Sequence, residues 1–183
     1  MSRFIFMKWS VVAILAGVTL QVASAADVDP CTQFKWDVSR ELAVMRQSPQ
    51  AITAAVKPDG AVPQIKLGAL YTVKLADQTV VRFVTNPAKL RMADGVTAGL
   101  VRVRVAKAAR YRVSITSGHW VDIIDADQTL KSLDFQGHVG CERPRKIVEY
   151  ELPADRELTL QLSGAKDAEV TMAVTAVSTG AAN

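Results

Sequence analysis

The chain has 183 residues, 49% of them hydrophobic and 22% charged, which is enough apolar material for the core of one ordinary domain. Its formal net charge at pH 7 is only +4, and two of the basic residues lie in a segment that we expect to be removed. A balance this small does not favour electrostatic attraction to nucleic acid or to a membrane surface, so we expect neither as a partner.

The first 25 residues have the layout of a secretory signal peptide. Arg3 and Lys8 form a short positive head, and a mostly apolar segment follows from Trp9 to Leu20. The small residues 23–25, Ala-Ser-Ala, then form a cleavage site. The apolar segment is shorter than the about 20 residues that a membrane-spanning helix needs. We therefore expect a mature protein that begins at Ala26, is periplasmic or secreted, and keeps no membrane anchor.

The chain contains two cysteines, Cys31 and Cys141. Two cysteines in an exported protein usually pair with each other. The bond would close a loop of about 110 residues and stabilise the fold by about 4–5 kcal/mol in the chain-entropy model. We interpret the pair as a structural disulfide that ties the start of the domain to a late loop, rather than as redox or metal-binding thiols.

One helix is expected, from residue 31 to residue 47. Asp37 is suited to the N-cap position, and Val38, Leu42 and Met45 recur at helical spacing. Pro49 ends the pattern, because proline cannot continue a helix. The following segment, 48–64, contains several prolines and a glycine and is typical of an irregular crossing toward a sheet.

From residue 68 onward the apolar period changes from helical spacing to two, which indicates strands. A hairpin is expected from 70–75 and 79–84 around a turn at 76–78, followed by a loop region at 85–98. Further strands are expected at 100–105, 111–116, 120–124, 130–135, 147–152, 157–162 and 170–177. Short strands repeating every about 8–12 residues favour a mainly β fold, an antiparallel β-sandwich of the jelly-roll type with one N-terminal helix. The pattern does not decide between closure as a sandwich and closure as a barrel.

The chain thus divides into a signal peptide (1–25), a helix with an irregular segment packed on the sandwich (26–66), the β-sandwich (67–177) and a flexible polar tail (178–183).

Two resemblances to known proteins accompany this pattern. The strands at 110–115, 120–125 and 158–164 follow one another as in the bacterial pre-peptidase C-terminal type of β-sandwich, which residues 99–177 resemble along with small carbohydrate-binding jelly-roll modules. The whole chain resembles a group of uncharacterised exported proteobacterial proteins that share the Phe34-Lys35-Trp36 start and the Gly140-Cys141 loop. Both resemblances imply a β-sandwich accessory module in the periplasm, and neither implies an activity.

Four arginines on two consecutive expected strands form the first candidate site: Arg102, Arg104, Arg110 and Arg112. Each lies opposite to the apolar face of its strand, so antiparallel pairing of the two strands would set like charges against each other. Such pairs destabilise a sheet by a few tenths of a kcal/mol to about 1 kcal/mol. An anion-binding face for an acidic glycan, a phosphate group or an acidic envelope partner would account for them. Alternatively, Glu149 and Glu151 from a neighbouring strand neutralise the row and leave ordinary solvated surface.

Histidine and carboxylate side chains suggest a second, metal-binding interpretation. His119, Asp122 and His138 could assemble a zinc or iron site, since these are suitable ligand types. Their spacing matches no metal motif. We therefore expect no cofactor in the favoured interpretation, and a metal ion only in the alternative.

The large aromatic residues are expected in the core for the most part, because Tyr111 and Tyr150 lie on the apolar faces of their strands. Trp120 is ambiguous, since it shares its face with Asp122.

The favoured function is a non-catalytic binding or accessory module. The alternatives are a metal-dependent enzyme and a structural envelope protein that self-associates through its sheet edges.

Overall fold

The computed structural model describes residues 28–177, in which the strands form two separate six-stranded sheets. The predicted signal peptide and C-terminal tail lie outside these residues. Sheet A has the strand order β1 (Gln50–Thr53), β3 (Tyr71–Lys74), β12 (Glu169–Ala176), β6 (Ala109–Ile115), β10 (Lys146–Leu152) and β9 (Asp134–Gly137). Sheet B has the order β2 (Gln64–Ile65), β5 (Thr97–Val105), β11 (Arg156–Ala165), β7 (Trp120–Asp125) and β8 (Gln128–Leu130), with β4 (Ala76–Asp77) paired to β5.

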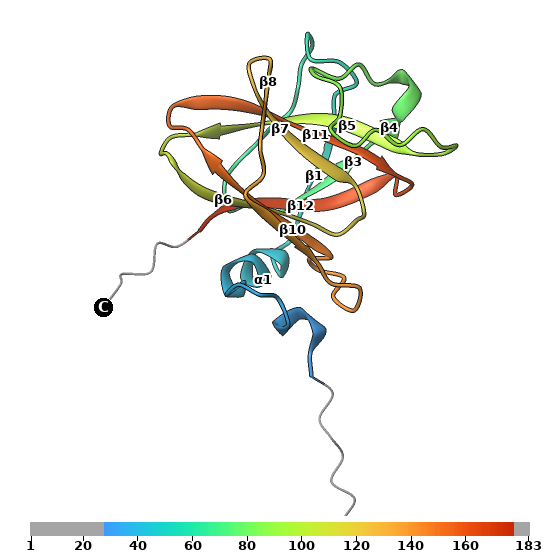
Figure 1. The fold of residues 1–183 in the computed structure, drawn as a ribbon. Helices are drawn as coiled ribbons and strands as arrows, with labels where there is room; N and C mark the ends of the chain where they lie inside the picture. The colour runs from blue at the N-terminus through green and yellow to red at the C-terminus, as the bar shows by residue number, and fades with distance from the viewer. Residues whose placement is uncertain (1–27, 178–183) are drawn as a thin grey trace, which may run out of the picture.

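The two sheets lie face to face as two layers (Figure 1) and share one apolar core. Side chains alternate across a strand, so every second residue of each central strand points into the space between the layers. In sheet B these include Val103 and Leu160, and in sheet A Val113 and Leu152, all with no exposed surface. This interior confirms the prediction of a mainly β sandwich with one helix.

Two strand pairs are parallel, so each sheet is mixed rather than purely antiparallel. β1 pairs in parallel with β3, and β2 pairs in parallel with β5. Parallel neighbours require long connections instead of tight turns. The segment 48–64, expected to be irregular throughout, supplies one of these strands (β1) and the first residue of the other (β2).

The predicted hairpin at 70–84 is wrong. β3 belongs to sheet A, whereas the next strand, β4, pairs with β5 in sheet B. Asp77 then accepts a hydrogen bond from the backbone N–H of Thr79 at 2.8 Å, and the chain turns into the 3-10 helix η2 (Gln78–Val80). The expected strand 130–135 is likewise divided, because the chain leaves β8 in one sheet and enters β9 in the other.

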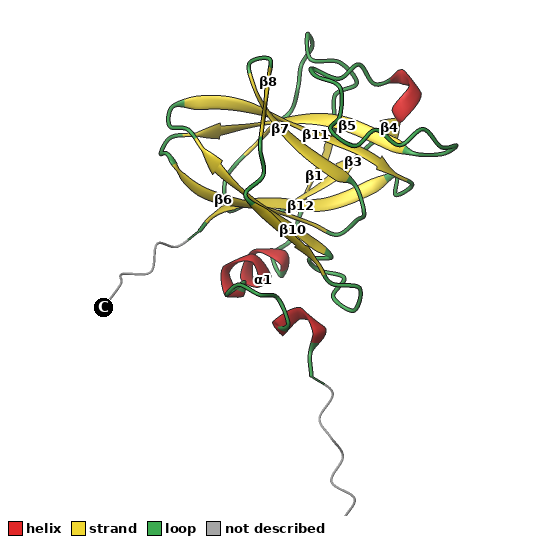
Figure 2. Cartoon of the chain, viewed as in Figure 1, coloured by secondary structure: helices red, strands yellow, loops and turns green. Residues whose placement is uncertain are grey.

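The helix α1 spans Ser39–Met45 and is shorter than predicted, with the 3-10 helix η1 (Pro30–Thr32) before it. Asp37 lies one residue before the N-cap position, which Val38 occupies, and its carboxylate accepts the N–H of Ser39 at 2.9 Å. Figure 2 shows α1 against the outer face of sheet A, where its Met45 packs in a small apolar cluster.

The disulfide between Cys31 and Cys141 is present, with a sequence separation of 110 residues and a Cα–Cα distance of 4.8 Å. This confirms the predicted pairing. Phe34 and Ile147 pack beside the bond. We refer to residues 30–45, which the bond and α1 hold on sheet A, as the N-terminal clasp.

Candidate functional site

The four candidate arginines do not form one face. β5, which carries Arg102 and Arg104, pairs with β11, β2 and β4, while β6, which carries Arg110 and Arg112, pairs with β10 and β12. The prediction that like charges face each other across a hairpin is therefore wrong. The physical reason is that residues 106–108 carry the chain from one sheet to the other instead of turning back within one sheet.

Acidic residues on neighbouring strands accompany the arginines in both sheets. On β5, Arg102 lies 3.2 Å from the carboxylate of Glu157, and Arg104 is opposite the same residue in the strand register. On β6, the exposed Arg110 lies 3.7 Å from Glu151. These exposed pairs contribute little to stability, and they reduce the positive charge of each surface.

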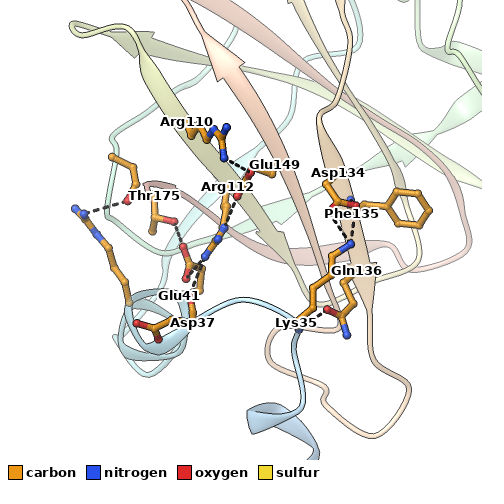
Figure 3. Close-up of polar contacts among 12 residues, drawn as sticks. Lys35, Asp37, Glu41, Arg110, Arg112, Asp134, Phe135, Gln136, Glu149 and Thr175 are labelled. Atoms are coloured by element: carbon orange, nitrogen blue, oxygen red, sulfur yellow. Dashed lines mark hydrogen bonds and ion pairs between the residues drawn. The ribbon is translucent and has the colours of Figure 1, made fainter. Parts of the chain in front are cut away.

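Arg112 is buried although it points away from the core of the sandwich, because the N-terminal clasp covers it. Its Nε donates to Glu149 at 2.9 Å, and its Nη1 donates to the backbone oxygen of Asp37 at 2.8 Å and lies 3.6 Å from Glu41 (Figure 3). The guanidinium also lies 4.8 Å from the centre of the Trp36 ring. Glu149 and Glu151, which were expected to neutralise the whole row, pair with Arg110 and Arg112 of β6 only, and Glu157 accompanies the arginines of β5. Arg112 is part of the contact between clasp and sheet.

The three candidate metal ligands are not brought together either. His119 is fully buried; its Nδ1 lies 2.7 Å from the hydroxyl of Ser117 and its Nε2 lies 3.0 Å from that of Thr97. His138 is half-buried, and its Nε2 lies 3.1 Å from the side-chain oxygen of Gln33. Within residues 28–177, no three His, Cys, Asp or Glu side chains are grouped so that they could hold a metal ion.

Burial controls the protonation of His119. Its pKa is lowered to about 4, mainly by loss of hydration and to a smaller extent by nearby Lys146, while Asp167 opposes the change. The imidazole is therefore neutral at physiological pH, with both nitrogens engaged by hydroxyl groups.

A cavity of about 210 Å³ opens at one flank of the sandwich, and we call it the flank cavity. It lies where β7 lacks a full neighbour, because β8 pairs only with Ile123–Asp125 and leaves the first half of β7 without a partner on that side. The segment 131–133 then crosses from β8 to β9. The lining side chains come from both sheets and from this crossing: Ala88, Trp120, Val121, Asp122, Thr129, Leu130, Lys131, Ser132, Phe135, Lys146, Val148 and Tyr150.

Two side chains of β10 donate hydrogen bonds across this flank to backbone oxygens at, and just before, the start of β7. Lys146 Nζ donates to the backbone oxygen of His119, and the hydroxyl of Tyr150 donates to the backbone oxygen of Val121 at 2.8 Å. These carbonyls would otherwise lack strand partners, and buried backbone oxygens require one. Lys146 thus lies on the inward face of β10, in line with the core residues Val148 and Tyr150.

The flank cavity places two lysines, Lys131 and Lys146, and one carboxylate, that of Asp122, beside aromatic rings. Burial lowers the pKa of Lys146 to about 8, although Asp122 counteracts part of the effect. The Lys146 ammonium also lies 5.8 Å from the centre of the Trp120 ring. Burial raises the pKa of Asp122, whose two oxygens accept hydrogen bonds from Trp120 Nε1 and from the N–H of Ala88. The Asp122 carboxylate is thus already engaged by the protein, whereas the Lys146 ammonium has further protons to donate.

The aromatic residues divide between core and site. Tyr111 and Tyr150 are buried as predicted, at 3% and 2% exposure. Phe135, one of the large aromatic residues of which most were expected in the core, is 60% exposed and lines the cavity, because β9 is an edge strand. Trp120 is half-buried and lines the same cavity. The sequence contains one signal for this site, namely a lysine at position 146 on the apolar face of a strand.

No model matched the chain in a scan against protein families, and a search of curated proteins found no match. In residues 28–177, no helix is long and apolar enough to cross a membrane.

Proposed function

We propose that this protein is a non-catalytic binding module and that the flank cavity holds its ligand, a small amphipathic molecule with an apolar ring and an anionic group. The observation that carries the proposal is the position of Lys146. The Lys146 ammonium faces inward into a largely apolar cavity and has lost part of its hydration. An anionic ligand would compensate for this loss by binding the ammonium directly.

The size of the flank cavity limits the ligand to one ring or a group of similar volume. An engineered apolar cavity of about 150 Å³ binds benzene, and the flank cavity measures about 210 Å³. Leu130 and Phe135 supply apolar surface for the ring, and Trp120 adds an aromatic wall. One proton of Lys146 is used by the backbone oxygen of His119, so the remaining protons can bind a carboxylate.

Affinity for benzoate tests this function, with neutral benzyl alcohol as the comparison. We expect benzoate to bind more tightly, and Lys146→Met to weaken benzoate by about tenfold or more, since a hydrogen bond to a charged group contributes about 1.5–3 kcal/mol. Leu130→Trp should abolish binding of both compounds by filling the cavity. Lys107→Met, the same substitution at an exposed site, should leave both affinities unchanged. Equal affinities for the two compounds, or benzoate binding that survives Leu130→Trp, would contradict the proposal.

We also propose that the protein acts in the periplasm or outside the cell, as the resemblance to exported accessory modules implies. The arrangement at the N-terminus, a signal-like segment followed by a disulfide-bonded domain, supports this placement. Fractionation of the producing cells, followed by N-terminal sequencing, is expected to recover a chain that begins at Ala26 in the periplasm or the medium. A full-length chain in the cytoplasm with two free thiols would contradict it.

A further inference from the structure

A second pocket lies beyond Trp120, on the outer face of sheet B, and none of the interactions described above uses it. Its volume is about 150 Å³, and it is lined by Lys89, Arg91, Gly118, Trp120, Ser163 and Gly164. Ser163 pairs with Trp120 across β11 and β7, and it alternates with the core residue Leu162, so its side chain lies on the face opposite the core. The segment that carries Lys89 and Arg91 covers this face, and we call the space between them the outer pocket.

Ser163 is the first sign that the outer pocket receives a ligand. The residue has no exposed surface, and within the described part of the chain its hydroxyl has no hydrogen-bond partner. Buried hydroxyl groups are nearly always hydrogen-bonded, because leaving one unpaired is costly. A ligand oxygen in the pocket would supply the missing acceptor.

Arg91 of the outer pocket is held in place through its backbone. The buried amide of Gln78 accepts from the N–H of Gly164 at 2.9 Å and donates to the backbone oxygen of Arg91 at 2.7 Å. Gly164 has a φ of +78°, and a β-carbon there would lie 3.4 Å from that of Arg91, so the glycine also permits this close approach. The covering segment is therefore fixed against β11 beside Ser163.

The positive charge of this segment is not neutralised by the protein. Neither Lys89 nor Arg91 takes part in any of the ion pairs formed among residues 28–177. Lys89 Nζ instead lies 5.6 Å from the centre of the Trp120 ring. The nearby carboxylate of Asp122 accepts hydrogen bonds from Trp120 and from the N–H of Ala88.

We propose that the outer pocket binds a tetrahedral oxyanion, namely phosphate, either free or as the phosphate group of a monoester. A guanidinium, an ammonium and a hydroxyl are the donors that bind phosphate oxygens in proteins. The volume is sufficient, since a cavity of about 150 Å³ holds benzene, which is larger than phosphate. This site is separate from the carboxylate ligand proposed for the flank cavity, although Trp120 lines both.

Calorimetric titration with inorganic phosphate and with methyl phosphate tests this site, using the mature protein in about 0.15 M NaCl to screen weak surface attraction. We expect saturable binding, a loss of tenfold or more in Arg91→Gln and in Lys89→Gln, and a smaller loss in Ser163→Ala. Arg104→Gln, which removes an exposed arginine from the same sheet, is the matched control and should bind as the wild type does. Tighter binding of methyl phosphate would assign a monoester as the ligand, and tighter binding of inorganic phosphate would assign the free ion.

Three results would overturn the proposal: no saturable binding of either compound, an equal loss in Arg104→Gln and Arg91→Gln, or full affinity in Ser163→Ala. Circular dichroism of each variant shows whether it is folded. The benzoate affinity of Arg91→Gln separates the two sites, because Arg91 does not line the flank cavity and its substitution should leave that affinity unchanged. Loss of phosphate binding with benzoate binding retained therefore concerns the outer pocket alone.

Discussion

Acid should destabilise this protein through one buried side chain, His119. Burial lowers the pKa of His119 from 6.5 to about 4 in the folded protein, whereas the unfolded chain keeps the ordinary value. Because the folded-state pKa is the lower one, the contribution to stability is complete above pH 6.5 and is lost as the pH falls through about 4. At about 1.36 kcal/mol per pH unit, this separation corresponds to about 3 kcal/mol.

Urea unfolding between about pH 7 and pH 4.5 measures this effect as the difference between the wild type and His119→Gln. The free energy of unfolding of the wild type should fall more steeply with decreasing pH than that of the variant. Asp122 has the opposite influence, since its raised pKa makes the folded state gain stability as the pH falls, and the subtraction removes this contribution. The aspartates with lowered pKa values, such as Asp37, lose their contribution only below the ordinary value of 3.8.

His138→Gln is the matched control, because it removes the other histidine of the chain, which is only half-buried. Its unfolding free energy should follow that of the wild type across the whole range. Parallel pH profiles for the wild type and His119→Gln would refute the conclusion that His119 is held neutral by burial. They would also reopen the question of its availability as a metal ligand.

Three further substitutions test the packing that supports the site. Arg112→Met should lower the free energy of urea unfolding by about 3–5 kcal/mol, because it removes the buried guanidinium that pairs with the two buried carboxylates of Glu41 and Glu149. A loss no larger than that of the exposed control Arg104→Met would contradict the burial of this network. Gly99→Ala places a β-carbon 2.4 Å from a neighbouring side chain and should cost about 1–3 kcal/mol in thermal unfolding, so an unchanged melting temperature would show that the two layers can separate there. Replacing Cys31 and Cys141 by alanine should cost about 4–5 kcal/mol in urea unfolding, and an unchanged midpoint would indicate that the clasp holds without the bond.

Alternation of apolar residues predicted most strands from residue 97 onward to within a few positions. Val101, Val103 and Val105 all point into the core, so the burial pattern of β5 repeats the sequence pattern directly. The disulfide was also predictable, because its two cysteines had no other partner. The pairing of strands was not, since residues 106–108 can either turn back within one sheet or cross to the other, and the same side chains are buried in both cases.

The exposure of each candidate residue depends on which segments pack over its strand, and the local sequence does not contain that information. Arg112 lies on the outward face of β6, yet it is 6% exposed because the clasp packs over it. Phe135 has the sequence of a core residue but is exposed, since the chain crosses between sheets just before it. Lys146 was the exception, because a lysine on an otherwise apolar strand face is visible in the sequence.

The most direct test of the proposed function is the measurement of intermolecular nuclear Overhauser effects between benzoate and the labelled protein. The flank cavity predicts contacts from the benzoate ring protons to the side chains of Leu130 and Tyr150. Contacts to the aliphatic protons of Arg102 and Arg104 instead, with none to the cavity, would contradict the account and return the binding site to the β5 surface.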